Sequence, residues 1–196
     1  MEITTALIKE LRDHTGLSIM QVKKALEEAK GDKEKALILL KKKSGDISAK
    51  KADRTLGAGT IASYIHSNGT VGTMVELSCE TDFVAKNPEF IALARDIAMH
   101  VAATNPLYLS RADISDEEKD KMKEAFEGEL EGKPANLREK IMEGKLEAFF
   151  SEKTLLDQSF IKNEDVTIQE KLDGAVQKFG EKTVIARFVR YSVLGK

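Results

Sequence analysis

The sequence predicts an α+β protein in which a small helical domain precedes a larger mixed core. Residues 3–40 carry apolar side chains at helical spacing in three short runs. From Gly59 onward the apolar side chains alternate with a period of two, as they do in strands. Residues 183–191 are again rich in β-branched and aromatic side chains, which favour strands. We therefore expect an N-terminal three-helix domain, followed by a core in which an antiparallel three-stranded sheet is packed with helices.

The N-terminal helices have recognisable ends. The first helix ends at Thr15-Gly16, the second begins with a capping box formed by Ser18 and Gln21, and the third begins at Asp32, a good N-cap. The apolar positions expected in their shared core are Val22, Ala25, Leu26, Ala29, Ala36, Leu37, Leu39 and Leu40. A bundle of this size is similar to ubiquitin-associated domains. Its small core leaves apolar side chains at the surface, where a partner can dock.

The composition changes after the third helix. Residues 41–54 contain six Lys or Arg against two Asp, without an aromatic side chain on which a nucleic-acid base could stack. This is typical of a linker or a solvated helix. We expect an N-terminal domain at 1–44, a basic linker at 45–56 and an α+β core domain at 57–196.

The core begins with a hairpin. Two alternating runs flank Ser67-Asn68-Gly69, and Asn-Gly is a strong hairpin signal. Pro88 then opens a long amphipathic helix that Pro106 ends. An acidic, exposed helix is expected within 113–131, where nine acids face three lysines. Further helices are expected at 137–150 and 166–178, and the strand at 183–191 is expected to pair with the hairpin.

Bulk properties exclude several classes of function. The net charge of −2 and the pI near 6.0 do not suit broad contact with nucleic acid, which requires a basic face. One cysteine, Cys79, cannot form an internal disulfide, which suits a reducing compartment. The sequence contains neither an export signal nor a run of roughly 20 apolar residues for a membrane span. We expect a soluble cytoplasmic protein without direct contact to nucleic acid or membrane.

No catalytic or metal site is predicted. His14, His66 and His100 fall on three different elements, and no Cys/His spacing suits zinc. No glycine-rich nucleotide loop occurs. His100, on the long helix, is expected to be a structural histidine. We therefore expect neither an enzyme nor a cofactor.

The most informative segment is 74–87. An apolar strand from Met74 runs directly into Glu80-Thr81-Asp82-Phe83-Val84, so that a large aromatic side chain lies where the strand ends. Residue types alone favour a Phe83 that folds back as a lid on the core. The alternative is a side chain that inserts into a partner.

Two motifs resemble the signatures of the elongation factor Ts family. The first comprises Glu76, Glu80-Thr81-Asp82-Phe83-Val84-Ala85 and Asn87, and the second Leu11-Arg12, Thr15-Gly16, Met20, Lys23 and Ala25-Leu26. Ile19 and Gln21 depart from the second signature, where Met and Asp are usual. The resemblance extends from Ile3 to about Leu194 and weakens within 107–150.

The resemblance implies a guanine nucleotide exchange factor for elongation factor Tu. Thr81, Asp82, Phe83 and Val84 would then act near the Mg²⁺ of the partner, with Phe83 as a wedge, and Ile19, Met20 and Lys23 would dock on its nucleotide-binding domain. Two alternatives remain: a ubiquitin-associated-type binding module with a scaffold domain, and an RNA- or ribosome-binding accessory protein, which the pI disfavours. Short family members tend to pair, so we also expect a homodimer built on the last strand, where Val184, Phe188 and Tyr191 need cover. The alternative is a monomer in which the helices at 137–150 and 166–178 cover the sheet.

Overall fold

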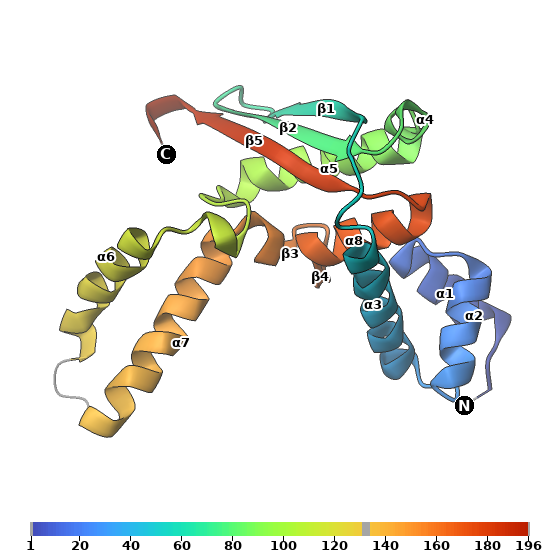
Figure 1. The fold of residues 1–196 in the computed structure, drawn as a ribbon, viewed down its shortest axis with the longest axis horizontal. Helices are drawn as coiled ribbons and strands as arrows, with labels where there is room; N and C mark the ends of the chain where they lie inside the picture. The colour runs from blue at the N-terminus through green and yellow to red at the C-terminus, as the bar shows by residue number, and fades with distance from the viewer. Residues whose placement is uncertain (1, 131–133, 196) are drawn as a thin grey trace.

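The computed structural model describes residues 2–130 and 134–195. It confirms the α+β fold: a sheet and its helices form the body, from which α1–α3 and the α6–α7 arm extend in different directions (Figure 1). The helices are α1 (Thr5–Thr15), α2 (Ile19–Glu28), α3 (Lys33–Lys50), α4 (Asp82–Ala85), α5 (Pro88–Thr104), α6 (Asp116–Glu127), α7 (Ala135–Lys153) and α8 (Ile168–Phe179). The strands are β1 (Ala58–Ile65), β2 (Val71–Cys79), β3 (Ser159–Phe160), β4 (Asn163–Thr167) and β5 (Val184–Ser192).

The N-terminal bundle forms as the apolar spacing predicts. The Ser18–Gln21 capping box is present at the start of α2, where it satisfies backbone donors that have no partner within the helix. Gly16 ends α1 with a φ of 70°, a conformation that a side chain disfavours. The buried apolar side chains of this bundle are Leu11, Leu17, Val22, Ala25, Leu26, Ala29, Ala36 and Leu40.

Helix α3 continues beyond the bundle and joins it to the core. It runs to Lys50, through most of the basic segment, and packs against α8. The buried hydroxyl of Ser44 donates a hydrogen bond to the Gln177 side chain of α8. Beyond the helix, Lys51 Nζ donates to the Gly180 carbonyl oxygen at 2.8 Å. The first part of the expected linker is thus helical and in contact with the core, and the division at 44 stays a prediction.

The sheet has the strand order β1-β2-β5, with both pairs antiparallel. The expected hairpin and the pairing of the last strand are thereby confirmed. The register shifts between Glu76 and Leu77, where β5 carries one extra residue, Ala186, opposite the last part of β2. One face of the sheet packs on α5, and the buried Val75, Leu77 and Ile185 belong to this main core.

The opposite face of the sheet carries exposed apolar side chains. In register across the strands, Met74 of β2 lies beside Val189 of β5, and Gly72 lies beside Tyr191. The large exposed apolar residues of the three strands are Ile61, Ile65, Met74, Val189 and Tyr191.

Three features were not predicted. Strands β3 and β4 form a second, two-stranded sheet, too short for a period-two pattern. Helix α4 replaces the expected turn after β2. Helices α6 and α7, although expected separately, pair as an arm. Near the base of this arm, Arg111 forms ion pairs with Asp157 and Glu147.

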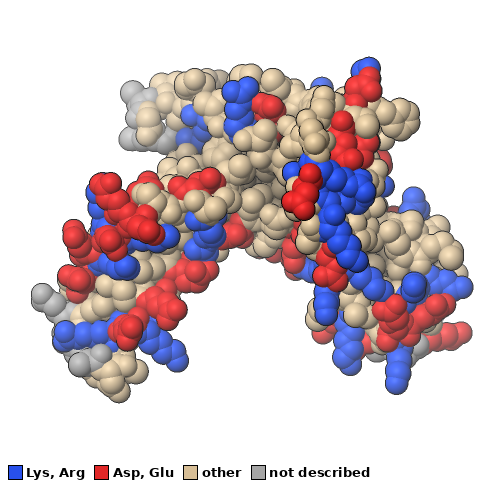
Figure 2. Space-filling view, viewed as in Figure 1, with Lys and Arg blue, Asp and Glu red and all other residues tan. Residues whose placement is uncertain are grey.

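On the face in Figure 2, acidic and basic side chains are mixed along this arm, while basic ones gather near the end of α3.

Candidate functional site

The loop after β2 presents Phe83 to solvent. The strand ends at Cys79, and Thr81 caps the single turn of α4 with a side-chain oxygen that accepts from the Val84 amide at 3.4 Å. Phe83 lies in the first residues of this turn and is 82% exposed. Val84 and Ala85, by contrast, are buried in the main core. The interpretation of Phe83 as a lid on the core is therefore wrong, because its neighbours anchor the turn and its own ring points outward.

A carboxylate distant in sequence holds this loop. Glu181, between α8 and β5, accepts hydrogen bonds from the backbone amides of Glu80 and Thr81 at 3.1 and 3.0 Å. The Thr81 hydroxyl donates to the other oxygen of the same carboxylate at 2.6 Å. Hydrogen bonds to an ionised acceptor are stronger than neutral ones, so the backbone immediately before Asp82 is held in one conformation.

Glu80 makes the reciprocal contact. Its carboxylate accepts from the Lys182 backbone amide at 2.6 Å and pairs with Arg54 at 3.2 Å. The Lys182 amide and Arg54 lower the pKa of Glu80 by stabilising its charged form. We call these contacts of Glu80 and Glu181 the acid clasp. It joins the exit of β2 to the entrance of β5, so Phe83 projects from a fixed support.

Asp82 is the second exposed side chain of the turn. Its carboxylate pairs with Lys86 one helical turn later, at 2.6 Å, and this contact lowers the pKa of Asp82. Both side chains are largely exposed, so the pair contributes little to stability. Asp82 is ionised and can exchange Lys86 for a basic group of a partner.

The N-terminal candidates are also exposed. Ile19 is 54% and Met20 74% exposed at the first turn of α2, and Lys23 follows one turn later. Ile38 of α3 is a further exposed apolar residue, which its sequence pattern does not mark. In the view of Figure 1, α2 and α4 lie at the same end of the molecule, away from the α6–α7 arm.

Of the two acids of the acid clasp, Glu80 belongs to the first sequence motif, but Glu181 could not be found from the sequence. Glu181 stands about a hundred positions from the residues that it binds, and an isolated acid before a strand is an ordinary feature. The only available signal is the position of Glu181-Lys182 directly before the strand that pairs with β2. Antiparallel pairing brings that entrance to the exit of β2.

The histidines take no part in this site. His100 is fully buried and accepts from the Ile161 amide through Nδ1 at 3.3 Å, while Nε2 lies 2.9 Å from Gln158 Oε1. This is the arrangement of a neutral structural histidine. Within 2–130 and 134–195, no group of three or more His, Cys, Asp or Glu side chains could hold a metal ion. Among the helices of the described residues, none is long and apolar enough to cross a lipid bilayer.

Similarity to known proteins extends over nearly the whole chain. The family described as Elongation factor TS matches residues 2–195. Relatives named elongation factor Ts are 48% identical over 193 residues in Carboxydothermus hydrogenoformans, 49% over 194 in Thermodesulfovibrio yellowstonii and 45% over 193 in Thermotoga maritima. These alignments cover 97, 98 and 98% of this chain and 89, 97 and 97% of the respective relatives.

These matches define the chain as a translation elongation factor. It belongs to the elongation factor Ts family, as the two sequence motifs predict.

Proposed function

We propose that this protein is a guanine nucleotide exchange factor that promotes the release of GDP from elongation factor Tu. The observation that carries the proposal is Phe83, an 82% exposed aromatic side chain on a turn whose two sides are fixed by the acid clasp and by buried Val84. A rigidly held aromatic side chain contributes strongly to an interface because little conformational entropy is lost on binding. The proposed setting is the cytoplasm, where translation takes place.

Exchange requires no chemistry from the protein itself. The factor binds the nucleotide-free partner more tightly than the nucleotide-bound one, and it thereby lowers the affinity of the partner for nucleotide. The coupling is reciprocal, so nucleotide weakens the binding of the factor by the same free energy. The protein is on this account a binding protein and not an enzyme, without a cofactor of its own.

The proposed lever is Asp82-Phe83. A GTPase holds its nucleotide through the phosphates and a Mg²⁺ that requires strict geometry, so displacing groups around the metal weakens the whole site. Phe83 inserts between partner side chains near this metal, and Asp82 exchanges Lys86 for a basic group of the partner. Thr81 and Val84 act from behind, as cap and buried anchor of the turn.

The proposed docking surface is the first turn of α2. Exposed Ile19 and Met20 supply apolar area, and Lys23 supplies a positive charge beside it. This surface binds the nucleotide-binding domain of the partner and directs Phe83 to the metal.

The experiment that tests the proposal is a release assay with elongation factor Tu loaded with fluorescent GDP. Substoichiometric protein should accelerate release, because each molecule acts repeatedly. A ubiquitin-associated-type module would bind without accelerating release. An RNA- or ribosome-binding protein would neither bind elongation factor Tu nor accelerate the release of GDP. Binding without acceleration, or no binding at all, would refute exchange activity.

We further propose a homodimer built on β5. This strand is an edge of the sheet, and its Tyr191 and Val189 are 72 and 36% exposed. A second copy covers both the edge and these side chains, as closed symmetric pairing permits. Of the other two residues expected at this contact, Phe188 is partly buried against the main core and supports the strand from within, whereas Val184 is half-buried. No disulfide is involved, because β5 carries no cysteine.

A further inference from the structure

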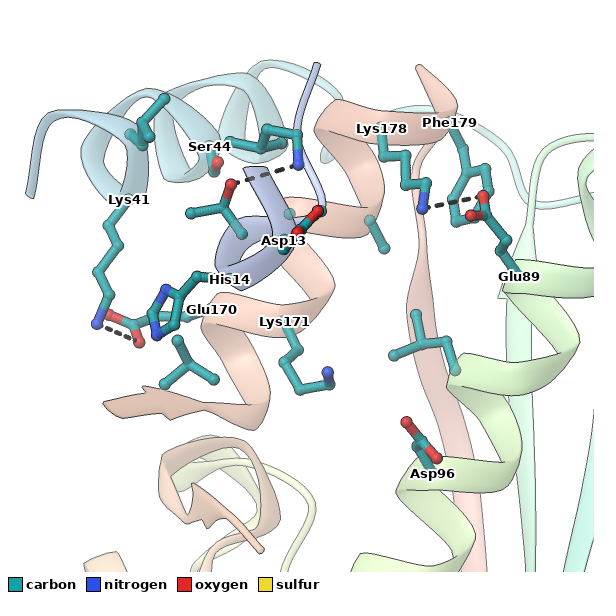
Figure 3. Close-up of a pocket in the computed structure, with 18 of the residues that line it drawn as sticks. Asp13, His14, Lys41, Ser44, Glu89, Asp96, Glu170, Lys171, Lys178 and Phe179 are labelled. Atoms are coloured by element: carbon teal, nitrogen blue, oxygen red, sulfur yellow. Dashed lines mark hydrogen bonds and ion pairs between the residues drawn. The ribbon is translucent and has the colours of Figure 1, made fainter. Parts of the chain in front are cut away.

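A cavity lies at the junction between the N-terminal bundle and the core. It has a volume of about 370 Å³, which falls within the range of small-molecule sites. Figure 3 shows its walls: the end of α1 and the side of α3 on one side, and α5 and α8 on the other. Its apolar lining comprises Leu17, Leu37, Leu40, Ala92, Leu93, Val166, Ala175 and Phe179.

Most charges around the cavity are already neutralised in pairs. Glu170 pairs with Lys41 at 2.9 Å, and Glu89 pairs with Lys178 at 2.9 Å (Figure 3). Asp96 pairs with Lys162 at 2.7 Å. A fourth acid of the lining, Asp13, is exposed to solvent at the rim. None of these carboxylates therefore needs a cationic ligand.

Lys171 is the exception. Its side chain extends from α8 into the space between α8 and α5 (Figure 3). Within the described part of the chain, no carboxylate forms an ion pair with it; its ammonium group lies 4.1 Å from the centre of the Phe160 ring. Burial lowers the pKa of Lys171, and the negative charge of Asp96 opposes this only in part. His14 Nδ1, also in the lining, is buried without a hydrogen-bond partner.

We propose that this cavity binds an amphipathic monoanion, with its anionic head on the ammonium group of Lys171 and its apolar body against the leucines of α3 and α5. The head gives Lys171 an ion-pair partner, because Glu89, Asp96 and Glu170 pair with other lysines, and the body replaces water on an apolar wall. A carboxylate or a sulfonate on an apolar body of about ten carbons has this chemistry. Because the ligand contacts both the bundle and the core, it also stabilises the junction between them.

Binding is tested on the full chain with two probes. 8-Anilinonaphthalene-1-sulfonate is titrated by fluorescence, and decanoate is then added as a competitor. Lys171→Met retains the aliphatic stem and removes the charge, so the fold is expected to remain. Lys42→Met is the matched control, since Lys42 is exposed on α3 and does not line the cavity. Met74→Lys controls for dye on the exposed face of the sheet.

We expect saturable binding of one dye per chain, displacement by decanoate, and a dissociation constant at least tenfold higher for Lys171→Met than for the wild type. Lys42→Met and Met74→Lys should bind like the wild type. Equal affinity in Lys171→Met, or loss of the one-to-one site in Met74→Lys, would overturn the proposal.

Chemical labelling gives an independent readout of the same site. An amine with a lowered pKa is more nucleophilic at neutral pH, so Lys171 should be acetylated by acetic anhydride faster than Lys42, as measured by peptide mass spectrometry. Decanoate should protect Lys171 and leave the labelling of Lys42 unchanged. Labelling of Lys171 that decanoate does not slow would also contradict the proposal.

Discussion

Replacement of Phe83 by Ala should slow nucleotide exchange on the partner while leaving the stability of the fold nearly unchanged. A Phe side chain buries roughly 150–250 Å² when fully enclosed, so a ring that is 82% exposed keeps only about 40 Å² from water in the free protein. At about 25 cal/mol per Å² this corresponds to at most ~1 kcal/mol of stability. The melting temperature should therefore fall by no more than about 4 °C.

The effect on exchange should be much larger. The remaining area, roughly four-fifths of the ring, becomes available for burial against the partner, and truncation of a central aromatic anchor typically costs about 2 kcal/mol. That free energy corresponds to roughly a thirtyfold change, and we expect the exchange rate to fall by at least tenfold. The assay is the release of fluorescent GDP from elongation factor Tu, with circular-dichroism melting of the same samples.

Leu107→Ala is the matched control, because Leu107 is 57% exposed and lies outside the proposed contact surfaces. It should leave exchange unchanged. A Phe83→Ala protein that melts and exchanges like the wild type would refute the wedge. A Phe83→Ala protein that melts far below the wild type and still exchanges normally would show that Phe83 stabilises the core and does not act on the partner.

Further outcomes test the clasp, the docking surface, the dimer and the buried histidine. Glu181→Ala removes three hydrogen bonds to the loop and should slow exchange about tenfold. Glu181→Gln should recover part of the rate, and Glu164→Ala, an exposed control, should exchange like the wild type. Exchange at the wild-type rate in all three variants would exclude a role for the acid clasp. Met20→Lys should raise the dissociation constant for elongation factor Tu roughly tenfold without altering the melting temperature, and unchanged binding would remove α2 from the interface. Light scattering should give about twice the 21.7 kDa chain mass at micromolar concentration and the monomer mass for Tyr191→Lys, whereas a concentration-independent monomer in the wild type would exclude the dimer. Burial lowers the pKa of His100 below 6.5, so the unfolded chain binds more protons in this range and stability should fall as the pH drops below 6.5; an NMR titration that places the imidazole pKa at or above 6.5 would contradict this.

The sequence alone determined the elements whose patterns are local. The capping box of Ser18 and Gln21, the Asn68-Gly69 hairpin and the Pro88 start of α5 all depend on residues within a few positions of one another. Spacing of apolar side chains also predicted the buried Val22, Ala25 and Leu26 of α2 and the buried Ala36 and Leu40 of α3, while Leu37 and Leu39, expected in the same core, are only partly buried. The same locality made the family recognisable, because both of its motifs are continuous in the chain.

Tertiary structure decided whatever depends on pairs distant in sequence. Exposure of Phe83 could not be read from its neighbours, because the direction of its ring depends on Val84 entering the core and on Glu181 fixing the backbone about a hundred residues away. The junction cavity likewise arises only where α3 meets α8 and α5, and there Lys171 forms no ion pair with a carboxylate of the described residues. Whether two distant groups form a hydrogen bond, or a charge has a partner, depends on where the fold places them. Neither group carries a local sequence signal for the other, so only the packed fold reveals it.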